Sequence, residues 1–254
     1  MHPILIDLGF YQIRTYGACV ALGFYLGMEL CKRLVQKRMP GKLAAFTDLS
    51  FWGLIVGFVG ARLLYVLTAL PYFSEDITRV VKIWEGGLVF FGGPLAVIPY
   101  TIWYVRKHKL RLWDILDVMT PGLVLAHAIG RIGCFFAGCC YGCPTNVSWA
   151  VKFEASDIIE SSLRHVAVHP VQLYESFLLF MLCGFFVWLF KRGKSGQVTV
   201  AYLLIYPCMR TALEMLRGDV IRGFVGPLST SQWISGFLFV VGIACLFRHR
   251  LVRK

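Results

Sequence analysis

Long apolar stretches alternate with short polar ones along almost the whole chain. A helix needs roughly 20 apolar residues to cross about 30 Å of hydrocarbon, and the sequence holds seven such stretches. They begin near positions 15, 46, 87, 113, 171, 197 and 230. There is no internal repeat, and the one long hydrophilic connection covers about 137 to 170. The pattern predicts an all-α, polytopic membrane bundle of seven transmembrane helices, folded as a single domain over 1–254.

The composition also indicates a membrane protein. Hydrophobic residues make up 57% of the 254 residues and charged residues only 16%, whereas soluble globular chains have about 45–50% and about 25%. The formal net charge of +12 would suggest nucleic acid in a soluble protein. In a membrane protein the same excess first indicates cationic cytoplasmic loops. We therefore expect membrane lipids, and no nucleic acid, among the partners.

The basic residues are distributed unevenly between alternate connections. Sixteen Lys and Arg lie in 32–42, 106–111, 191–194 and 248–254, against seven in the other connections and the amino-terminal segment. Because loops rich in Lys and Arg stay in the cytoplasm, the amino terminus is predicted outside and the carboxyl terminus inside. The first residues lack a basic start and contain Asp7, so no cleaved signal peptide is expected.

Three arginines fall inside predicted spans: Arg62, Arg131 and Arg210. An unpaired charge there costs at least about 2.5–3.5 kcal/mol on insertion scales. Counting 1.5 Å per residue puts all three in the outer half of the membrane, which predicts one anion-binding site. Two of the three could instead have a purely structural role. Arg62 could snorkel or form a salt bridge, and Arg210 could pair with Glu214 at i+4.

Arg131 differs from the other two arginines. It has no acidic residue three or four positions away on its own helix, and its i−4 neighbour is His127. A guanidinium group can bind phosphate through two parallel hydrogen bonds. Arg131 is therefore the residue that we expect to bind an external anion.

Several short motifs surround these charges. They are TYG at 15–17, WEGGLVFFGG at 84–93, HAIGRIGCFFAGCCYGCPT at 127–145, HPVQLYE at 169–175 and RTALEMLRGD at 210–219. In this order they resemble the bacterial phosphatidylglycerol prolipoprotein diacylglyceryl transferase family. The resemblance implies a multi-pass enzyme of the bacterial inner membrane without a cofactor. Such an enzyme moves the diacylglyceryl group of phosphatidylglycerol onto the lipobox cysteine thiol of a preprolipoprotein and releases glycerol phosphate.

The resemblance also implies roles for individual residues. Arg131 and Gly142 match a signature assigned to phosphatidylglycerol binding. The family's RxxxExxR element is matched by Arg210, Glu214 and Arg217, and the tyrosine of its WYG segment by Tyr16. Three positions depart from the family pattern: Phe91 stands for a histidine, Cys134 for an asparagine and Cys139 for an acidic residue.

Alkylation of a thiol at a glyceryl carbon needs a thiolate and a stabilised phosphate leaving group. Arg131 and Arg210 can stabilise the phosphate. Arg62 and Arg217 are further candidates for binding the lipid substrate. His127, Tyr16 and Glu214 are candidates for the base, and the sequence does not choose among them. Glu175 is expected to brace a neighbouring side chain.

Four of the nine cysteines cluster at Cys134, Cys139, Cys140 and Cys143. The CxxC spacing at 140–143 is compatible with redox chemistry or metal binding, but an outer-face location favours a disulfide or small-residue packing. We expect no metal, and the nucleophile is expected to be the thiol of the substrate. A membrane thiol-disulfide oxidoreductase is the rival enzyme, and an anion or lipid transporter is the rival without catalysis.

Overall fold

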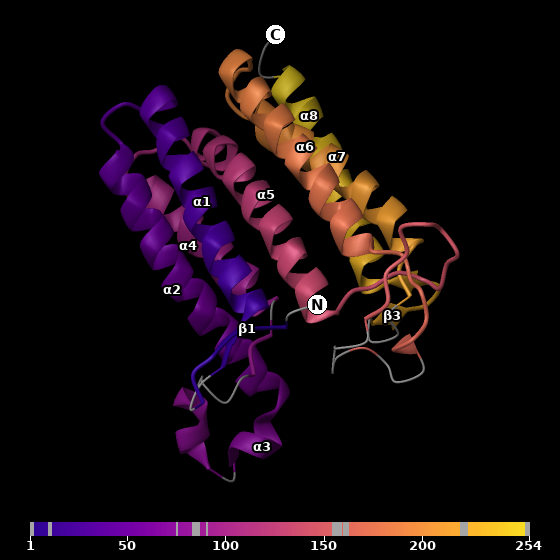
Figure 1. Ribbon diagram of the computed structural model, residues 1–254. Helices are drawn as coiled ribbons and strands as arrows, with labels where there is room; N and C mark the ends of the chain where they lie inside the picture. The colour runs from indigo at the N-terminus through magenta and orange to yellow at the C-terminus, as the bar shows by residue number, and fades with distance from the viewer. Residues whose placement is uncertain are drawn as a thin grey trace. The chain divides into compact units, whose positions relative to one another are not determined.

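The computed structural model describes residues 3–9, 12–74, 76–82, 87–89, 91–153, 159, 163–218 and 223–251. Helices dominate this part of the chain (Figure 1). The longer helices are α1 (Thr15–Arg38), α2 (Leu43–Thr68), α4 (Gly92–Lys107), α5 (Leu112–Ala137), α6 (Val171–Arg192), α7 (Gln197–Glu214) and α8 (Thr230–Leu251). Between α2 and α4 lie the short helix α3 (Leu70–Ser74) and the 3₁₀ helix η1 (Ile77–Val81).

Each predicted apolar stretch coincides with one of the longer helices, and most of the starting positions agree within three residues. Among the described residues, four helical segments are long and apolar enough to cross a membrane: Leu43–Thr68, Leu112–Ala137, Val171–Arg192 and Thr230–Phe247. The protein is thus a helical membrane protein. The count of seven spans stays a prediction, since α1, α4 and α7 are not among these four.

The third predicted stretch begins later than expected. Residues 84–86 and 90 of the WEGGLVFFGG motif lie outside the described residues. Gly87 has a φ of +80°, and the Val89 N–H donates to the Ala61 carbonyl, 3.1 Å away in α2. The chain here makes its hydrogen bond to another helix, so α4 starts at Gly92 and not near 87.

The chain divides into two compact units. One contains Met1–Cys31 and Leu116–Lys254, and the other contains Lys32–Ile115. The chain passes from one unit to the other within α1 and within α5. In the unit Lys32–Ile115, α2 packs along α4, and Arg38 lies 3.9 Å from Asp114. The expected single domain over 1–254 stays a prediction.

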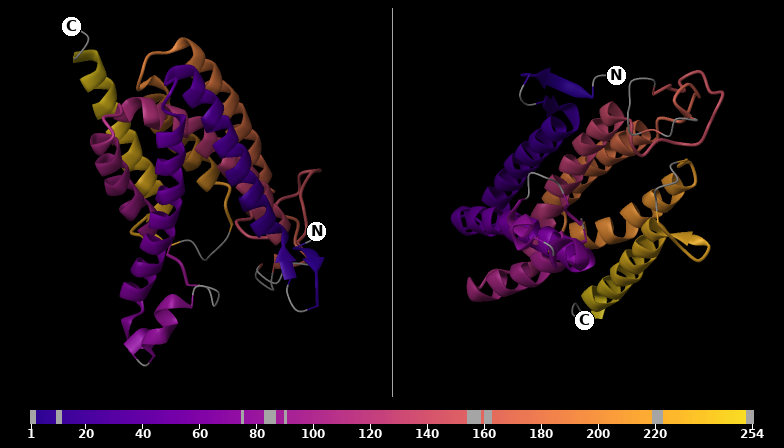
Figure 2. Two further views of the ribbon diagram at one scale, coloured as in Figure 1. Left: turned by 90° about the vertical axis from the view of Figure 1, so that its left-hand side faces the viewer. Right: turned by 90° about the horizontal axis from the view of Figure 1, so that it is seen from below.

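Two small hairpins accompany the helices and were not predicted. Strands β1 (Ile4–Asp7) and β2 (Gln12–Arg14) pair antiparallel before α1, and β3 (Phe224–Val225) pairs with β4 (Leu228–Ser229) before α8. Figure 2 shows the first hairpin at the start of α1. The connection between α5 and α6 has its own small core, formed by the buried side chains of Tyr141, Phe153, Ile159 and Val168.

A buried aspartate sets the relation of α7 to α5. Asp117 of α5 is fully buried. Its carboxylate accepts hydrogen bonds from the backbone N–H groups of Gly196 and Thr199, at 2.6 and 2.9 Å, and from the Thr199 hydroxyl. An anion is stabilised at a helix N-terminus, so Asp117 holds the start of α7. At 1.5 Å per residue, Arg131 lies about 21 Å beyond Asp117 along α5, and Arg210 lies about 17 Å beyond Thr199 along α7. The two arginines therefore lie at a similar height along their helix axes.

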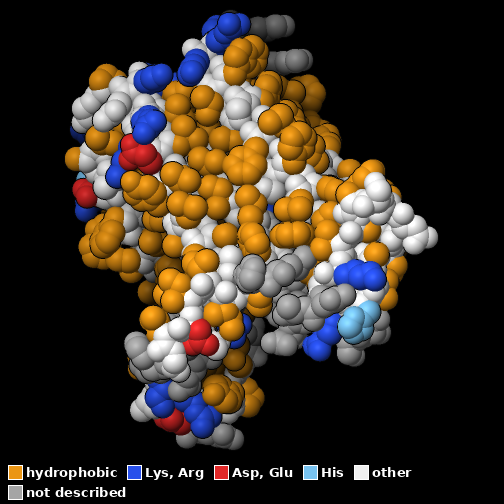
Figure 3. Space-filling model, viewed as in Figure 1, with side chains coloured by type: hydrophobic (Ala, Val, Ile, Leu, Met, Phe, Trp, Pro, Cys, Tyr) orange, Lys and Arg blue, Asp and Glu red, His pale blue; other side chains and the backbone are white. Residues whose placement is uncertain are grey.

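The outer surface of the helices is apolar. Hydrophobic side chains cover most of the helical surface that Figure 3 shows. In the most apolar window of α2 only 17% of the residues are buried, and in that of α8 only 11%. Side chains such as Leu67 and Phe237 are more than 60% exposed. In water such a surface would drive aggregation, and in a bilayer it faces lipid chains.

The first half of α1 packs closely against α5 through two glycines. A Cβ atom at Gly27 would lie 2.6 Å from the Gly122 carbonyl oxygen. That oxygen belongs to the backbone and cannot rotate away. The contact fixes α5, which carries the residues of the candidate site, against α1.

We predict that Gly27→Ala lowers the free energy of unfolding by about 1–3 kcal/mol, the usual effect of overpacking. Thermal unfolding in detergent measures it. The matched control is Gly184→Ala on α6, where nothing lies within 4 Å of the added Cβ. That control should be neutral or stabilising by up to about 1 kcal/mol because alanine favours helix. Equal melting temperatures for the two variants would contradict the close approach.

Candidate active site

A single buried carboxylate joins the charged residues of three helices. Glu175 of α6 is 1% exposed. Its Oε2 atom lies 3.0 Å from Nε of Arg131 on α5 and 4.0 Å from Nη1 of Arg210 on α7. Its Oε1 atom lies 3.5 Å from Nε2 of His127. Glu175 therefore braces its neighbours, as expected, and it is the centre of the site.

A second carboxylate extends this network. Glu214 Oε2 lies 2.9 Å from Nη2 of Arg210 and 4.0 Å from Nη1 of Arg217. The predicted pair of Arg210 and Glu214 is confirmed. Three arginines thus share two glutamates, Glu175 and Glu214. With His127 neutral, the network has one positive charge more than its carboxylates balance, in a place where a charge is costly to bury.

The interpretation of Arg131 as an arginine without a carboxylate partner is wrong, because only neighbours on its own helix were considered. Glu175, on another helix, is that partner. A sequence signal for it exists, since Glu175 is the only acidic residue in Val171–Arg192.

The contact with Glu175 uses the Nε atom of Arg131 and leaves the terminal nitrogens of its guanidinium group available for hydrogen bonds to a ligand. Both of its contacts are made by Nε, to Glu175 and at 3.3 Å to His127 Nε2. Among the described residues, its two terminal nitrogens make no hydrogen bond. The side chain is 13% exposed. The two terminal NH₂ groups can still bind an anion.

Arg62 has its own set of contacts. It belongs to the unit Lys32–Ile115. Its guanidinium group donates to the carbonyls of Arg79, Val80, Lys82 and Gly87, and it lies over the rings of Tyr65 and Phe73. These contacts account for a buried arginine without any ligand, so the structure gives no support to the expectation that Arg62 binds substrate.

Gly142 holds the connection after α5 against two other segments. Its N–H donates to the His169 carbonyl at 2.9 Å, and the neighbouring Tyr141 carbonyl accepts from the Gly218 N–H at 3.1 Å. A Cβ at Gly142 would lie 2.6 Å from the His169 Cβ. Only glycine fits this approach, which brings the connection next to Arg217, its bridge partner.

Tyr16 lies at a cavity near the start of α1. The cavity has a volume of about 320 Å³. Its walls come from the first hairpin, the start of α1 and the end of α5; the lining residues are Pro3, Ile4, Gln12, Arg14, Tyr16, Ala137 and Cys139. The Tyr16 side chain is 47% exposed. This volume falls at the lower end of the range of ligand pockets, about 300–1,000 Å³.

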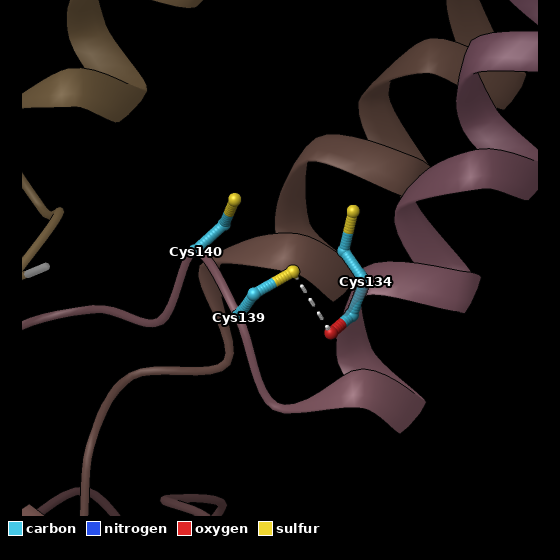
Figure 4. Close-up of side chains that lie close together, drawn as sticks. All are labelled: Cys134, Cys139 and Cys140. Atoms are coloured by element: carbon cyan, nitrogen blue, oxygen red, sulfur yellow. Dashed lines mark hydrogen bonds between the residues drawn. The ribbon is translucent and has the colours of Figure 1, made fainter. Parts of the chain in front are cut away.

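The clustered cysteines are grouped differently from the sequence interpretation. The Sγ atoms of Cys134, Cys139 and Cys140 all lie within 4.8 Å of one another (Figure 4). Cys143 is not in this group, and its thiol donates to the Arg217 carbonyl. The group therefore contains only one of the two cysteines of the CxxC spacing at 140–143.

The thiols of this group are free in the structure. Hydrogen bonds with the two neighbouring thiols lower the pKa of the Cys140 thiol, and the charges of Arg131 and Arg217 act in the same direction. Three sulfur atoms thus lie close to the cationic network.

The remaining candidates are placed as follows. Phe91 precedes α4 in the unit Lys32–Ile115 and is 47% exposed. His169 Nδ1 lies 3.2 Å from the Tyr174 hydroxyl. Asp219, at the end of the RTALEMLRGD motif, lies outside the described residues.

Comparisons with known proteins identify the family of this chain. The family model described as "Prolipoprotein diacylglyceryl transferase" matches residues 3–248. A phosphatidylglycerol–prolipoprotein diacylglyceryl transferase of Clostridium tetani is 35% identical over 244 residues, 96% of each chain. One of Synechocystis is 31% identical over 99% of this chain and 90% of its own. One of Ligilactobacillus salivarius is 30% identical over 98% and 94%. The chain therefore belongs to the prolipoprotein diacylglyceryl transferase family.

Proposed function

We propose that this protein transfers the diacylglyceryl group of phosphatidylglycerol to the thiol of a lipobox cysteine in preprolipoproteins. A carbon–sulfur bond forms at the glyceryl carbon, the carbon–oxygen bond to phosphate breaks, and glycerol phosphate leaves with the electron pair. The observation that carries the proposal is the network of three arginines and two glutamates. Its excess positive charge and the available NH₂ groups of Arg131 suit a phosphodiester.

Arg131 is proposed to hold the phosphate of the donor lipid. Glu175 and His127 contact its Nε atom, which orients the guanidinium plane while its terminal nitrogens stay available. As the carbon–oxygen bond breaks, negative charge grows on the phosphate. Donors fixed in advance stabilise such charge most in a site that excludes water.

Arg210 and Arg217 are proposed to supply the second part of the anionic site. Both contact Glu214, so this glutamate acts by holding them and not as the base. Gly142 contributes through its backbone position next to Arg217. Of the three candidate bases, His127 and Glu214 are thus engaged with arginines, and Tyr16 is the one that lines the cavity.

Two alternative functions are not favoured. An oxidoreductase built on the CxxC pair lacks the grouping of Cys140 with Cys143. A transporter of anions or lipids has no need of a network that fixes the orientation of one arginine side chain through its Nε atom.

The proposed location is the bacterial inner membrane, with seven spans, the amino terminus outside and the carboxyl terminus in the cytoplasm. The bacterial relatives support the location. The orientation is supported by basic pairs in the last turns of three helices: Lys37 and Arg38 of α1, Arg106 and Lys107 of α4, and Lys191 and Arg192 of α6. Such residues mark cytoplasmic ends.

Transfer is tested with purified protein in detergent, phosphatidylglycerol and a lipobox peptide, by the gain of a diacylglyceryl mass on the peptide cysteine. Arg131→Ala should lower kcat by about 10²–10³, the usual effect of removing one such donor. Arg131→Lys keeps the charge but loses the planar fork, so it should also lose most activity. Arg192→Ala, at the other end of α6 from Glu175, is the matched control and should keep its activity. If the Arg131→Ala protein transferred the diacylglyceryl group at the parent rate, the proposal that Arg131 holds the phosphate of the donor would be wrong.

Glu175→Gln keeps the shape of the side chain and removes its charge. Because it leaves buried arginines without their partner, we expect a loss of about 3–5 kcal/mol in stability together with reduced transfer. Thermal unfolding in detergent and the peptide assay measure the two effects. The neighbouring Ser176→Ala loses one hydrogen bond, to the Ala128 carbonyl, and should cost only about 1 kcal/mol. A Glu175→Gln protein as stable as the Ser176→Ala protein would show that the carboxylate does not organise the site.

The orientation is tested with reporter fusions in intact bacteria. A green fluorescent protein fused after residue 254 should fluoresce, because it folds in the cytoplasm, and alkaline phosphatase at the same place should be inactive. Fusions after residue 149, in the connection between α5 and α6, should give the reverse pattern. Active phosphatase at the carboxyl terminus would contradict the proposed topology.

A further inference from the structure

Three of the clustered cysteines, which we call the cysteine group, come from two different elements at the end of α5. Cys134 lies in the last turns of the helix, and Cys139 and Cys140 lie in the connection that follows (Figure 4). Their sulfur atoms lie within 4.8 Å of one another, and all three thiols are free in the structure. The transfer reaction proposed above gives none of them a role.

The backbone at the end of α5 holds the cysteine group together. Gly138 has a φ of +75°, and the Cys139 N–H donates to the Cys134 carbonyl at 3.2 Å, as in a Schellman motif. Cys140 follows with a φ of +60°, which is uncommon for a residue other than glycine. The buried Gln172 side chain donates to the Cys139 carbonyl at 2.6 Å. The closeness of the three sulfur atoms thus follows from how the helix ends.

Cys140 has the features of an attacking thiol. A disulfide is attacked by a thiolate and not by a thiol. Hydrogen bonds from the Cys134 and Cys139 thiols lower the pKa of the Cys140 thiol. The positive charges of Arg131 and Arg217 act in the same direction. The group therefore combines one thiolate with two further thiols within reach of it.

Cys134 is the thiol that can complete an exchange begun by Cys140. Cys139 is adjacent to Cys140, and the Cα atoms of adjacent residues are about 3.8 Å apart. Most disulfides join Cα atoms that are about 4.4–6.8 Å apart, so this adjacent pair is a poor match. Cys134 is six positions from Cys140, and a change of side-chain rotamers can bring their sulfur atoms from within 4.8 Å to bonding distance.

The cysteine group lies near the route of an acceptor thiol. Cys139 lines the cavity of about 320 Å³ that also contains Tyr16. Arg131 and Cys134 are three positions apart on α5 and so lie on neighbouring parts of one helix face. An acceptor that enters from the cavity and reaches the phosphate at Arg131 therefore passes the three sulfur atoms.

We propose that Cys140 and Cys134 reduce an acceptor cysteine that is blocked as a disulfide with a small thiol, and so return it to the form that accepts lipid. The inference rests on the proposed transferase function and adds a second activity beside the same site. Acceptors carry their cysteine to the outer face of the membrane, where disulfides form and persist. A sulfur atom blocked in this way cannot attack the glyceryl carbon.

The exchange is balanced in atoms and electrons. The Cys140 thiolate attacks the sulfur of the small thiol, the acceptor disulfide breaks, and the acceptor sulfur leaves with the electron pair as a thiolate. Cys134 gives its proton to water and attacks the Cys140 sulfur, which forms a disulfide between the two cysteines and releases the small thiol. Two electrons thus pass from the two cysteines to the acceptor disulfide. Each further turnover needs an external dithiol that reduces the pair again.

A single-turnover experiment tests the exchange without lipid. The full chain is reduced, freed of reductant in detergent and mixed with a lipobox peptide whose cysteine is joined to glutathione. We expect one free peptide thiol and one glutathione per chain, and a protein that has lost two hydrogen atoms and joins Cys134 to Cys140. A lone thiol would keep one of the two products as an adduct, so release of both identifies a pair. Failure to release both products, or a disulfide between other cysteines, would overturn the proposal.

Variants identify the role of each thiol. Cys140→Ser should lower the exchange rate at least tenfold, because an ordinary thiol is mostly protonated at pH 7. Cys134→Ser should leave glutathione attached to Cys140, since the second step is then missing. Cys143→Ser is the matched control in the same connection and should exchange at the parent rate. Parent-rate exchange by Cys140→Ser, or a Cys134→Ser protein without the adduct, would contradict the proposed pair.

Addition of phosphatidylglycerol separates the exchange from the transfer. The parent protein should add lipid to the free peptide and, up to one per chain, to the glutathione-blocked peptide. Cys140→Ser should lower the yield of lipidated blocked peptide, relative to free peptide, at least tenfold. If the parent lipidates the free peptide but leaves the blocked one unchanged, the exchange is wrong and the transferase function stands. If the parent frees the peptide thiol but lipidates neither peptide, the exchange stands and the transferase function is rejected.

Discussion

The site depends on one buried ion pair, the contact of Glu175 with Arg131. A carboxylate that is 1% exposed inside an apolar bundle is tolerated only with cationic partners. Glu175 has them on two other helices, Arg131 on α5 and Arg210 on α7. The pair therefore determines how α5, α6 and α7 pack together. The ion pair uses the Nε atom of Arg131. The two terminal NH₂ groups of the same side chain remain as donors that suit a phosphate.

A second buried anion makes this arrangement possible. Asp117 holds the start of α7 against α5, and the two arginines follow at similar distances along their helices. Beyond them the chain leaves α5 and returns through Gly142, whose close contact with the residue before Pro170 anchors the connection at the entrance to α6. The charged network and the cysteine group thus lie at the same end of α5. The proposed reaction places the phosphate of the donor at the charged network.

The sequence by itself determined the helical membrane fold, the positions of the long helices and the family. Each of these depends on local or linear information: runs of apolar residues, basic loops and motif order. Arg210 and Glu214 were also paired correctly, because residues four positions apart meet on any helix. The start of α4 was misplaced because the residues before it bond to α2, which is a tertiary contact.

Only the tertiary structure decided which charges and which sulfur atoms meet. Glu175 lies 44 positions after Arg131 in the sequence, and nothing in the local pattern relates the two residues. Arg62 looked like the other arginines in the sequence, but the backbone carbonyls around it satisfy its donors. The sequence placed Cys140 in a cluster of four cysteines without saying which sulfur atoms meet, and the end of α5 and the left-handed backbone of Cys140 bring it to Cys134 and Cys139. Periodicity reports which face of a helix is apolar, whereas the partners of a buried charge or thiol depend on how separate helices pack and where loops turn.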